Sequence, residues 1–128
     1  LIAATAIEAG AVDMTVVSYL ESRHEVKAYN PTNNERGLFQ ISPICLKAWN
    51  KYNDPDYKPQ HLFNAGVNRQ IALWYMNERI PELLRAYDIP VTEKNKLWAY
   101  NAGIGHVRRG EMPEITKRYI ERYFELKE

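Results

Sequence analysis

The chain has 128 residues, of which 45% are hydrophobic and 26% are charged, enough for one hydrophobic core but too few for two ordinary domains. We therefore expect a single globular domain over residues 1–128. Lys and Arg total 17 against 16 Asp and Glu, and the resulting net charge of +1 excludes a strong field for steering polyanions. We expect no nucleic-acid partner.

Cys45 is the only cysteine, which excludes an intramolecular disulfide, and its apolar neighbours Ile44 and Leu46 are typical of a small buried hydrophobe. The first twenty residues are apolar, but Glu8 and Asp13 interrupt them and no basic flank is present. The sequence therefore predicts neither a retained signal peptide nor an integral membrane segment.

The first third of the chain predicts two helices and a loop. Residues 1–9 favour a short helix that Gly10 ends. Asp13 is placed to cap a second helix, whose apolar residues recur at helical spacing and whose last turn carries Glu21. Residues 26–36 are polar, with one proline and three asparagines, and indicate an irregular surface loop.

The middle of the chain predicts two further helical segments. Ser42 is an expected N-cap, followed directly by proline, for a helix that ends near Asn50. Residues 53–59 are rich in Pro, Asp and Asn and predict turns. Asn64 is placed to cap the longest periodic segment, which Pro81 should kink or split.

The last third predicts two more helices. Thr92 is the expected cap of one, and Gly103 is expected to end it in the left-handed conformation. Pro113 opens the other, which carries an apolar stripe formed by Ile115, Tyr119, Ile120, Tyr123 and Phe124. No segment shows convincing strand alternation, so the predicted fold class is all-α.

Glu21 is the strongest candidate for chemistry, because it ends an apolar helix. A carboxyl that protonates a leaving oxygen near neutral pH needs apolar surroundings, which disfavour its charged form. Such surroundings are available from Val17, Leu20, Leu38 and Ile41. A glutamate at a helix end is, taken alone, more often a solvated surface residue. Other residues must therefore support the assignment.

Three segments supply that support, in chain order: Glu21-Ser22, Gly37-Leu38-Phe39-Gln40-Ile41 and Ala99-Tyr100-Asn101-Ala102-Gly103. With them the chain resembles the SLT-type lytic transglycosylases, which carry three such signatures in this order. The resemblance extends to a helix from Asn68 to Met76 and a closing element from Thr116 to Ile120. It spans roughly residues 2–125.

The resemblance implies a lysozyme-like helical fold with a substrate groove, acting on peptidoglycan glycan strands. Such enzymes cleave the β-1,4 bond between N-acetylmuramic acid and N-acetylglucosamine and leave a 1,6-anhydromuramoyl end, without consuming water. Glu21 would be the single catalytic acid/base, and no cofactor is implied. The residues that would bind the glycan are Ser22, Asn30, Gln40, Ile41, Tyr100, Asn101 and Tyr119.

Departures from the family pattern leave alternatives open. Asn34-Glu35 stands where the family usually has Gly-Ala, and a carboxylate across the scissile bond could activate water, giving a lysozyme-type muramidase. A solvated ion pair between Glu35 and Arg36 is the simpler interpretation. His24 could tune Glu21 from one helical turn away or simply pack. A third alternative is a catalytically inactive peptidoglycan-binding module.

Other templates fail on their spacing. The segment from His24 to Ala28 begins like a zinc-protease helix but lacks the second histidine, so no metal site is expected. Gly103 to Arg108 lacks the third glycine of a dinucleotide loop and follows a helix. A groove enzyme of this size needs no partner to form its site, so we expect a monomer. The implied location is periplasmic, cell-wall associated or within a phage particle.

Overall fold

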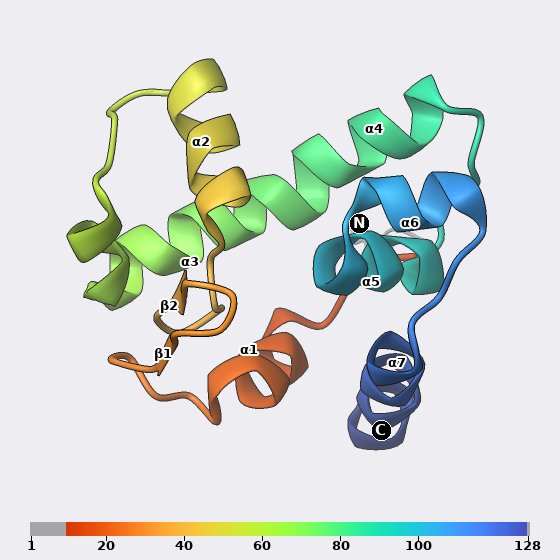
Figure 1. Ribbon diagram of the computed structural model, residues 1–128, viewed down its shortest axis with the longest axis horizontal. Coiled ribbons are helices and arrows are strands. Elements are labelled where there is room, and N and C mark those ends of the chain that lie inside the picture. The colour runs from red at the N-terminus through yellow and green to blue at the C-terminus, as the bar shows by residue number, and fades with distance from the viewer. Residues whose placement is uncertain (1–9, 128) are drawn as a thin grey trace, which may run out of the picture. The chain divides into compact units, whose positions relative to one another are not determined.

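The computed structural model describes residues 10–127, and its regular secondary structure is almost entirely helical (Figure 1). Residues 14–75 form one compact unit, and the described residues on either side of them form another. Within the described part of the chain, the only strands are β1 (Tyr29–Asn30) and β2 (Glu35–Arg36). The all-α, lysozyme-like fold class is therefore confirmed. The helix expected over residues 1–9 lies outside the described residues, and the single domain stays a prediction.

In the unit of residues 14–75, helix α1 (Met14–Ser22) begins directly after Asp13 and carries Glu21 in its last turn, as predicted. The loop prediction for residues 26–36 is wrong in part, because β1 and β2 pair there as an antiparallel hairpin. Strands of two residues are too short to show alternation in sequence. They are held by contacts outside the hairpin, such as the Gly37 amide donating to the Ala28 carbonyl at 2.7 Å.

Helix α2 (Pro43–Tyr52) starts where the sequence predicts, with the Ser42 hydroxyl accepting a hydrogen bond from the Cys45 amide. It ends two residues beyond the predicted Asn50. Cys45 is buried, as expected, on the same face as the buried Trp49, and burial raises the pKa of the Cys45 thiol. A buried, protonated thiol packs as a small hydrophobe.

A turn region and the 3-10 helix η2 (Pro59–Phe63) lead into α3 (Ala65–Trp74). The Asn64 side chain accepts from the Val67 amide at 3.0 Å and caps α3, which confirms that prediction. The rings of Trp49 and Trp74 meet edge to face, with centroids 5.6 Å apart. This aromatic contact packs α2 against α3.

Pro81 splits the predicted long helix, as expected. The π-helical segment η3 (Tyr75–Arg79) separates α3 from α4 (Ile80–Ala86). A proline cannot donate to the carbonyl four residues earlier, and its ring crowds that carbonyl. The hydrogen-bonding pattern therefore changes just before Pro81.

In the other unit, α5 (Glu93–Ala102) is capped by Thr92, whose hydroxyl accepts from the Asn95 amide. Gly103 ends α5 as predicted, but its φ of 93° and ψ of 152° are not the left-handed helical conformation expected. This region is open essentially to glycine alone. It lets the chain start α6 (Ile104–Arg109) at once, a helix that the sequence did not predict.

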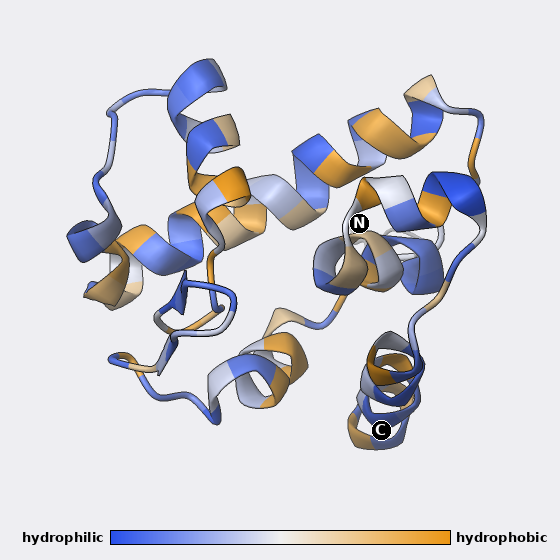
Figure 2. Cartoon of the chain, viewed as in Figure 1, coloured by the Kyte–Doolittle hydropathy of each residue, from blue (hydrophilic) through white to orange (hydrophobic). Residues whose placement is uncertain are grey.

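Helix α7 (Glu114–Leu126) closes this unit, with hydrophobic and hydrophilic residues on different sides (Figure 2). Ile120 and Tyr123 of the predicted stripe are buried, but Ile115 is 73% exposed and Phe124 is 41% exposed, and Thr116 takes the inward position. The Tyr123 hydroxyl donates to Glu93 at 2.5 Å and accepts from the Asp13 amide at 2.7 Å. Burial is the main cause that raises the Tyr123 pKa.

Candidate functional site

The first two signatures are joined by a hydrogen bond. The Ser22 hydroxyl lies 2.6 Å from the Leu38 carbonyl oxygen and 3.2 Å from the Ser18 carbonyl oxygen. Because a hydroxyl has one proton to donate, the shorter contact is the main bond. Glu21, one residue earlier, is partly exposed. The last turn of α1 is thus fixed to the loop of residues 37–41.

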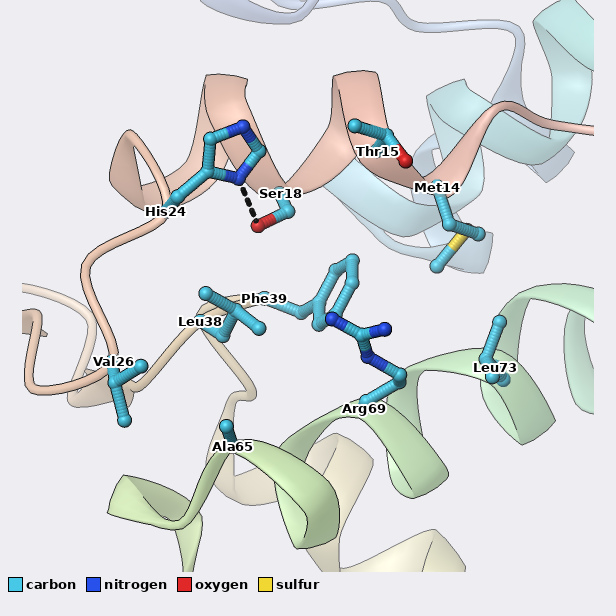
Figure 3. Close-up of a pocket in the computed structure, with 10 residues that line it drawn as sticks. All are labelled: Met14, Thr15, Ser18, His24, Val26, Leu38, Phe39, Ala65, Arg69 and Leu73. Atoms are coloured by element: carbon cyan, nitrogen blue, oxygen red, sulfur yellow. Dashed lines mark hydrogen bonds between the residues drawn. The ribbon is translucent and has the colours of Figure 1, made fainter.

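The chain leaves α1 through two residues with left-handed backbone, Arg23 with φ of 54° and His24 with φ of 64°. Such conformations are uncommon for residues other than glycine and are found more often at functional sites. His24 lies beyond the end of α1, so it is not placed one helical turn from Glu21. Its ring instead turns back onto the Ser18 hydroxyl, at 2.9 Å (Figure 3).

Gly37 allows the second signature to lie against the chain beneath it. Its φ is +82°, and a Cβ built there would stand 2.2 Å from the Leu62 carbonyl oxygen and 2.3 Å from the Asn68 Nδ2. Both distances are far below van der Waals contact. A side chain at Gly37 would therefore force this loop away from its support.

Asn68 on α3 provides that support. It is fully buried; its Oδ1 accepts from the Phe39 amide at 2.7 Å, and its Nδ2 donates to the Arg36 and Leu62 carbonyls, both at 2.9 Å. Sequence reasoning noted Asn68 only through the family resemblance and gave it no role. The available signal was an asparagine among the inward apolar positions of the helix, where a buried amide requires partners.

Gln40 and Ile41 complete the loop. Gln40 has φ of 51° and is 8% exposed, and its Nε2 donates to the Gly37 carbonyl at 3.0 Å and the Ala28 carbonyl at 3.3 Å. Ile41 is 1% exposed, and its backbone exchanges two hydrogen bonds with Arg36. The Gln40 amide is thus oriented by backbone contacts, and the Ile41 side chain packs in the core.

The hairpin brings Asn30 opposite Glu35. Burial raises the pKa of the Glu35 carboxyl above its ordinary value of 4.5, and a hydrogen bond from the Asn30 side chain partly opposes this rise. The predicted ion pair between Glu35 and Arg36 is wrong: no ion pair to Glu35 occurs among residues 10–127. Neighbours on a strand point to opposite faces, and the Arg36 guanidinium lies over the Tyr29 ring instead.

The third signature lies in the other unit, on α5. Asn101 Oδ1 accepts from the Thr116 hydroxyl at 2.7 Å, and Thr116 is 1% exposed on α7. This bond links the third signature to the closing element. Tyr100, Asn101 and Tyr119 are each partly exposed.

The predicted site residues therefore form two local sets. Glu21, Ser22, Asn30, Gln40 and Ile41 lie in the unit of residues 14–75, and Tyr100, Asn101 and Tyr119 lie in the other. In the described part of the chain no cluster of three His, Cys, Asp or Glu side chains could hold a metal ion. None of the helices described there is long and apolar enough to cross a membrane.

Comparison with known protein families identifies the class of protein to which the chain belongs. The transglycosylase SLT domain model matches residues 6–121, nearly the whole chain, and the chain belongs to this family. Its function at family level is therefore lytic-transglycosylase-type glycan cleavage, and the family acts on peptidoglycan. No curated protein and no solved structure matches the chain significantly.

Proposed function

We propose that this domain is a peptidoglycan lytic transglycosylase in which Glu21 is the single catalytic acid/base. The bond cleaved is the β-1,4 link from N-acetylmuramic acid to N-acetylglucosamine. The product carries a 1,6-anhydromuramoyl end, and no cofactor takes part. The proposal adds a specific bond, product and catalytic residue to the general activity of the family, which is glycan cleavage.

The observation that carries the proposal is the fixed junction between the Glu21-Ser22 turn and the loop of residues 37–41. Ser22 holds one side of that loop through Leu38, and Asn68 holds the other through Phe39. A catalytic carboxyl must be held to a fraction of an ångström to act in a single geometry. The bonds around Glu21 give support of this kind.

In the proposed reaction, the protonated Glu21 carboxyl gives its proton to the glycosidic oxygen as the bond from that oxygen to C1 breaks. The resulting carboxylate then takes the proton from the muramoyl 6-hydroxyl, whose oxygen attacks C1. The N-acetylglucosamine side leaves with a free 4-hydroxyl, and Glu21 returns to its protonated form. All atoms come from the substrate, which is why no water is consumed.

The other site residues would orient the glycan. Gln40 offers its Oε1, which accepts no hydrogen bond from the described residues, as an acceptor for a sugar hydroxyl or amide. Ser22 and Ile41 would act mainly by shaping the loop, because the Ser22 proton and the Ile41 side chain are already engaged. The residues proposed to contact sugar directly are Asn30, Gln40, Tyr100, Asn101 and Tyr119.

A second candidate is a lysozyme-type muramidase in which Glu35 activates water. Glu35 is partly buried and has no cationic partner among the described residues. Burial raises its pKa, and the Asn30 hydrogen bond partly opposes this rise, in favour of the ionised form that a base requires. We favour the transglycosylase because one carboxyl suffices for it. A catalytically inactive binding module is the third possibility.

Product analysis distinguishes the three. Purified peptidoglycan is digested with the wild-type domain and with Glu35→Gln, and the soluble muropeptides are weighed by mass spectrometry. Products lighter than reducing muropeptides by one water, formed by both proteins, support the transglycosylase. Reducing ends that are lost in Glu35→Gln establish the muramidase, and wall binding without soluble products establishes the inactive module.

Location and assembly follow from the same proposal. A peptidoglycan-cleaving domain works outside the cytoplasm or in a phage particle. We expect a single domain that acts as a monomer, because a groove enzyme of this size needs no partner to form its site.

A further inference from the structure

A cavity of about 510 Å³ lies within the unit of residues 14–75, between α1 and α3 (Figure 3). Its walls are mostly apolar and include Met14, Val26, Leu38 and Leu73. The volume is in the range of pockets that enclose small organic ligands. None of the proposed glycan-binding residues lines it, and neither does Glu21. The cavity is therefore a different site from the one proposed for glycan cleavage.

Arg69 gives the cavity its chemical character. Its side chain extends from α3 into the cavity, beside the Phe39 ring (Figure 3). Arg69 takes part in none of the ion pairs of residues 10–127. No acidic residue lines the cavity. Arg69 is an exposed residue, so its guanidinium donors are available at the cavity, and no carboxylate from the described residues forms an ion pair with them.

The other polar lining groups do not supply that carboxylate. Ser18 and His24 are hydrogen-bonded to each other at the edge of the cavity, at 2.9 Å (Figure 3). Neither carries a negative charge. The cavity therefore combines an apolar body with one positive group, which is complementary to a ligand with an apolar body and one negative group.

We propose that this cavity binds a small aliphatic carboxylate, with the carboxylate on Arg69 and the chain against Met14, Leu38 and Leu73. Arginine binds carboxylates through two parallel hydrogen bonds, and the apolar walls offer contacts to the aliphatic chain. The proposal does not depend on the proposed function, because binding at this cavity requires no turnover of peptidoglycan.

The position of the cavity predicts which NMR resonances a bound ligand should shift. Leu38 and Phe39 both line the cavity. The Leu38 carbonyl accepts a hydrogen bond from Ser22, and the Phe39 amide donates one to Asn68. A ligand in the cavity thus lies against the loop that carries Gln40. Backbone amide resonances of residues 37–40, and those around Arg69, should shift on binding.

The test is a titration of the ¹⁵N-labelled domain with octanoate, followed by NMR. We expect saturable shifts confined to residues around the cavity. Arg69→Met should weaken octanoate at least about tenfold, the loss expected for a charge-assisted hydrogen bond. Arg85→Met, which removes an exposed arginine of α4, is the matched control and should leave binding unchanged.

Two further arms make the result decisive. Octan-1-ol has the same chain without the charge and should bind at least about tenfold more weakly than octanoate. Ala65→Phe fills the cavity while keeping Arg69 and should abolish binding. Equal binding of octanoate and octanol, equal affinity in Arg69→Met, or shifts away from the cavity would each overturn the proposal.

Discussion

Asn68 is predicted to stabilise the loop of the second signature more than any exposed polar residue nearby. It is fully buried and satisfies the Phe39 amide and the Leu62 and Arg36 carbonyls. Asn68→Ala removes all three bonds at once. A buried polar group left without a partner costs much more than the average hydrogen bond contributes.

The expected magnitude follows from what each partner loses. The Phe39 amide loses its 2.7 Å acceptor, at about 1–3 kcal/mol, and the Leu62 carbonyl loses its donor, at about 0.5–1.5 kcal/mol. The Arg36 carbonyl still accepts from the Ile41 amide at 3.0 Å, so its loss is small. The free energy of unfolding should fall by about 2–4 kcal/mol, a large share of the about 5–15 kcal/mol typical of a domain.

Urea unfolding followed by circular dichroism measures this change, with the m-value used to check that the denatured state is unaltered. Asn33→Ala, in the exposed hairpin turn, is the control and should be nearly neutral. Asn68→Asp keeps the side-chain shape but presents oxygen to two carbonyls, so it should be at least as destabilising as alanine. A loss below about 1 kcal/mol in both Asn68 variants would refute the reasoning.

Two further predictions concern the same region. Gly37→Ala adds a Cβ 2.2 Å from the Leu62 carbonyl oxygen and should lower the free energy of unfolding by about 2–5 kcal/mol. The control is Gly110→Ala, where φ is +69° but the surrounding space is open, and it should lower that free energy by only about 1–2 kcal/mol. Equal losses of stability in urea unfolding would contradict the predicted clash. Because burial raises the Glu35 pKa, that carboxyl favours folding when protonated, a contribution fully present below about pH 4.5 and lost as pH rises through the folded pKa. Glu35→Gln should therefore melt above wild type near pH 7, with the difference shrinking below about pH 4.5, and a difference that grows in acid would contradict this.

Much of the fold was predictable because helix starts are set by neighbouring residues. Ser42, Asn64 and Thr92 each cap the helix that the sequence assigned to them, through a side-chain oxygen and an amide three residues later. Glu21 likewise falls in the last turn of α1. These interactions are local, so a single sequence contains them.

The structural features that the sequence did not predict are very short elements or depend on partners distant in sequence. The two-residue strands of the hairpin depend on bonds such as that between the Arg36 and Ile41 backbones. Helix α6 has only six residues, and one of them is Gly105, which lowers the helix propensity of the segment. Ile115 was assigned to the buried stripe of α7, but Thr116 is turned inward because its hydroxyl reaches Asn101 across to α5.

The sequence names candidate site residues, such as Glu21, Gln40 and Asn101, whose roles stay predictions, but it does not give their hydrogen bonds. The importance of Asn68 depends on its helix lying beneath the loop that it supports. The Glu35 environment was likewise missed, because pairing with Asn30 rather than Arg36 depends on strand direction.

The most direct test of the central claim is the activity of Glu21→Gln, measured as the rate of release of soluble muropeptides from purified peptidoglycan. The matched control is Glu25→Gln, four residues later in the exposed turn after α1. We predict that Glu21→Gln folds normally, by circular dichroism and urea unfolding, and loses essentially all activity, while Glu25→Gln retains the wild-type rate. A folded Glu21→Gln variant that still releases 1,6-anhydro products at a rate near wild type would contradict the assignment of Glu21 as the acid/base.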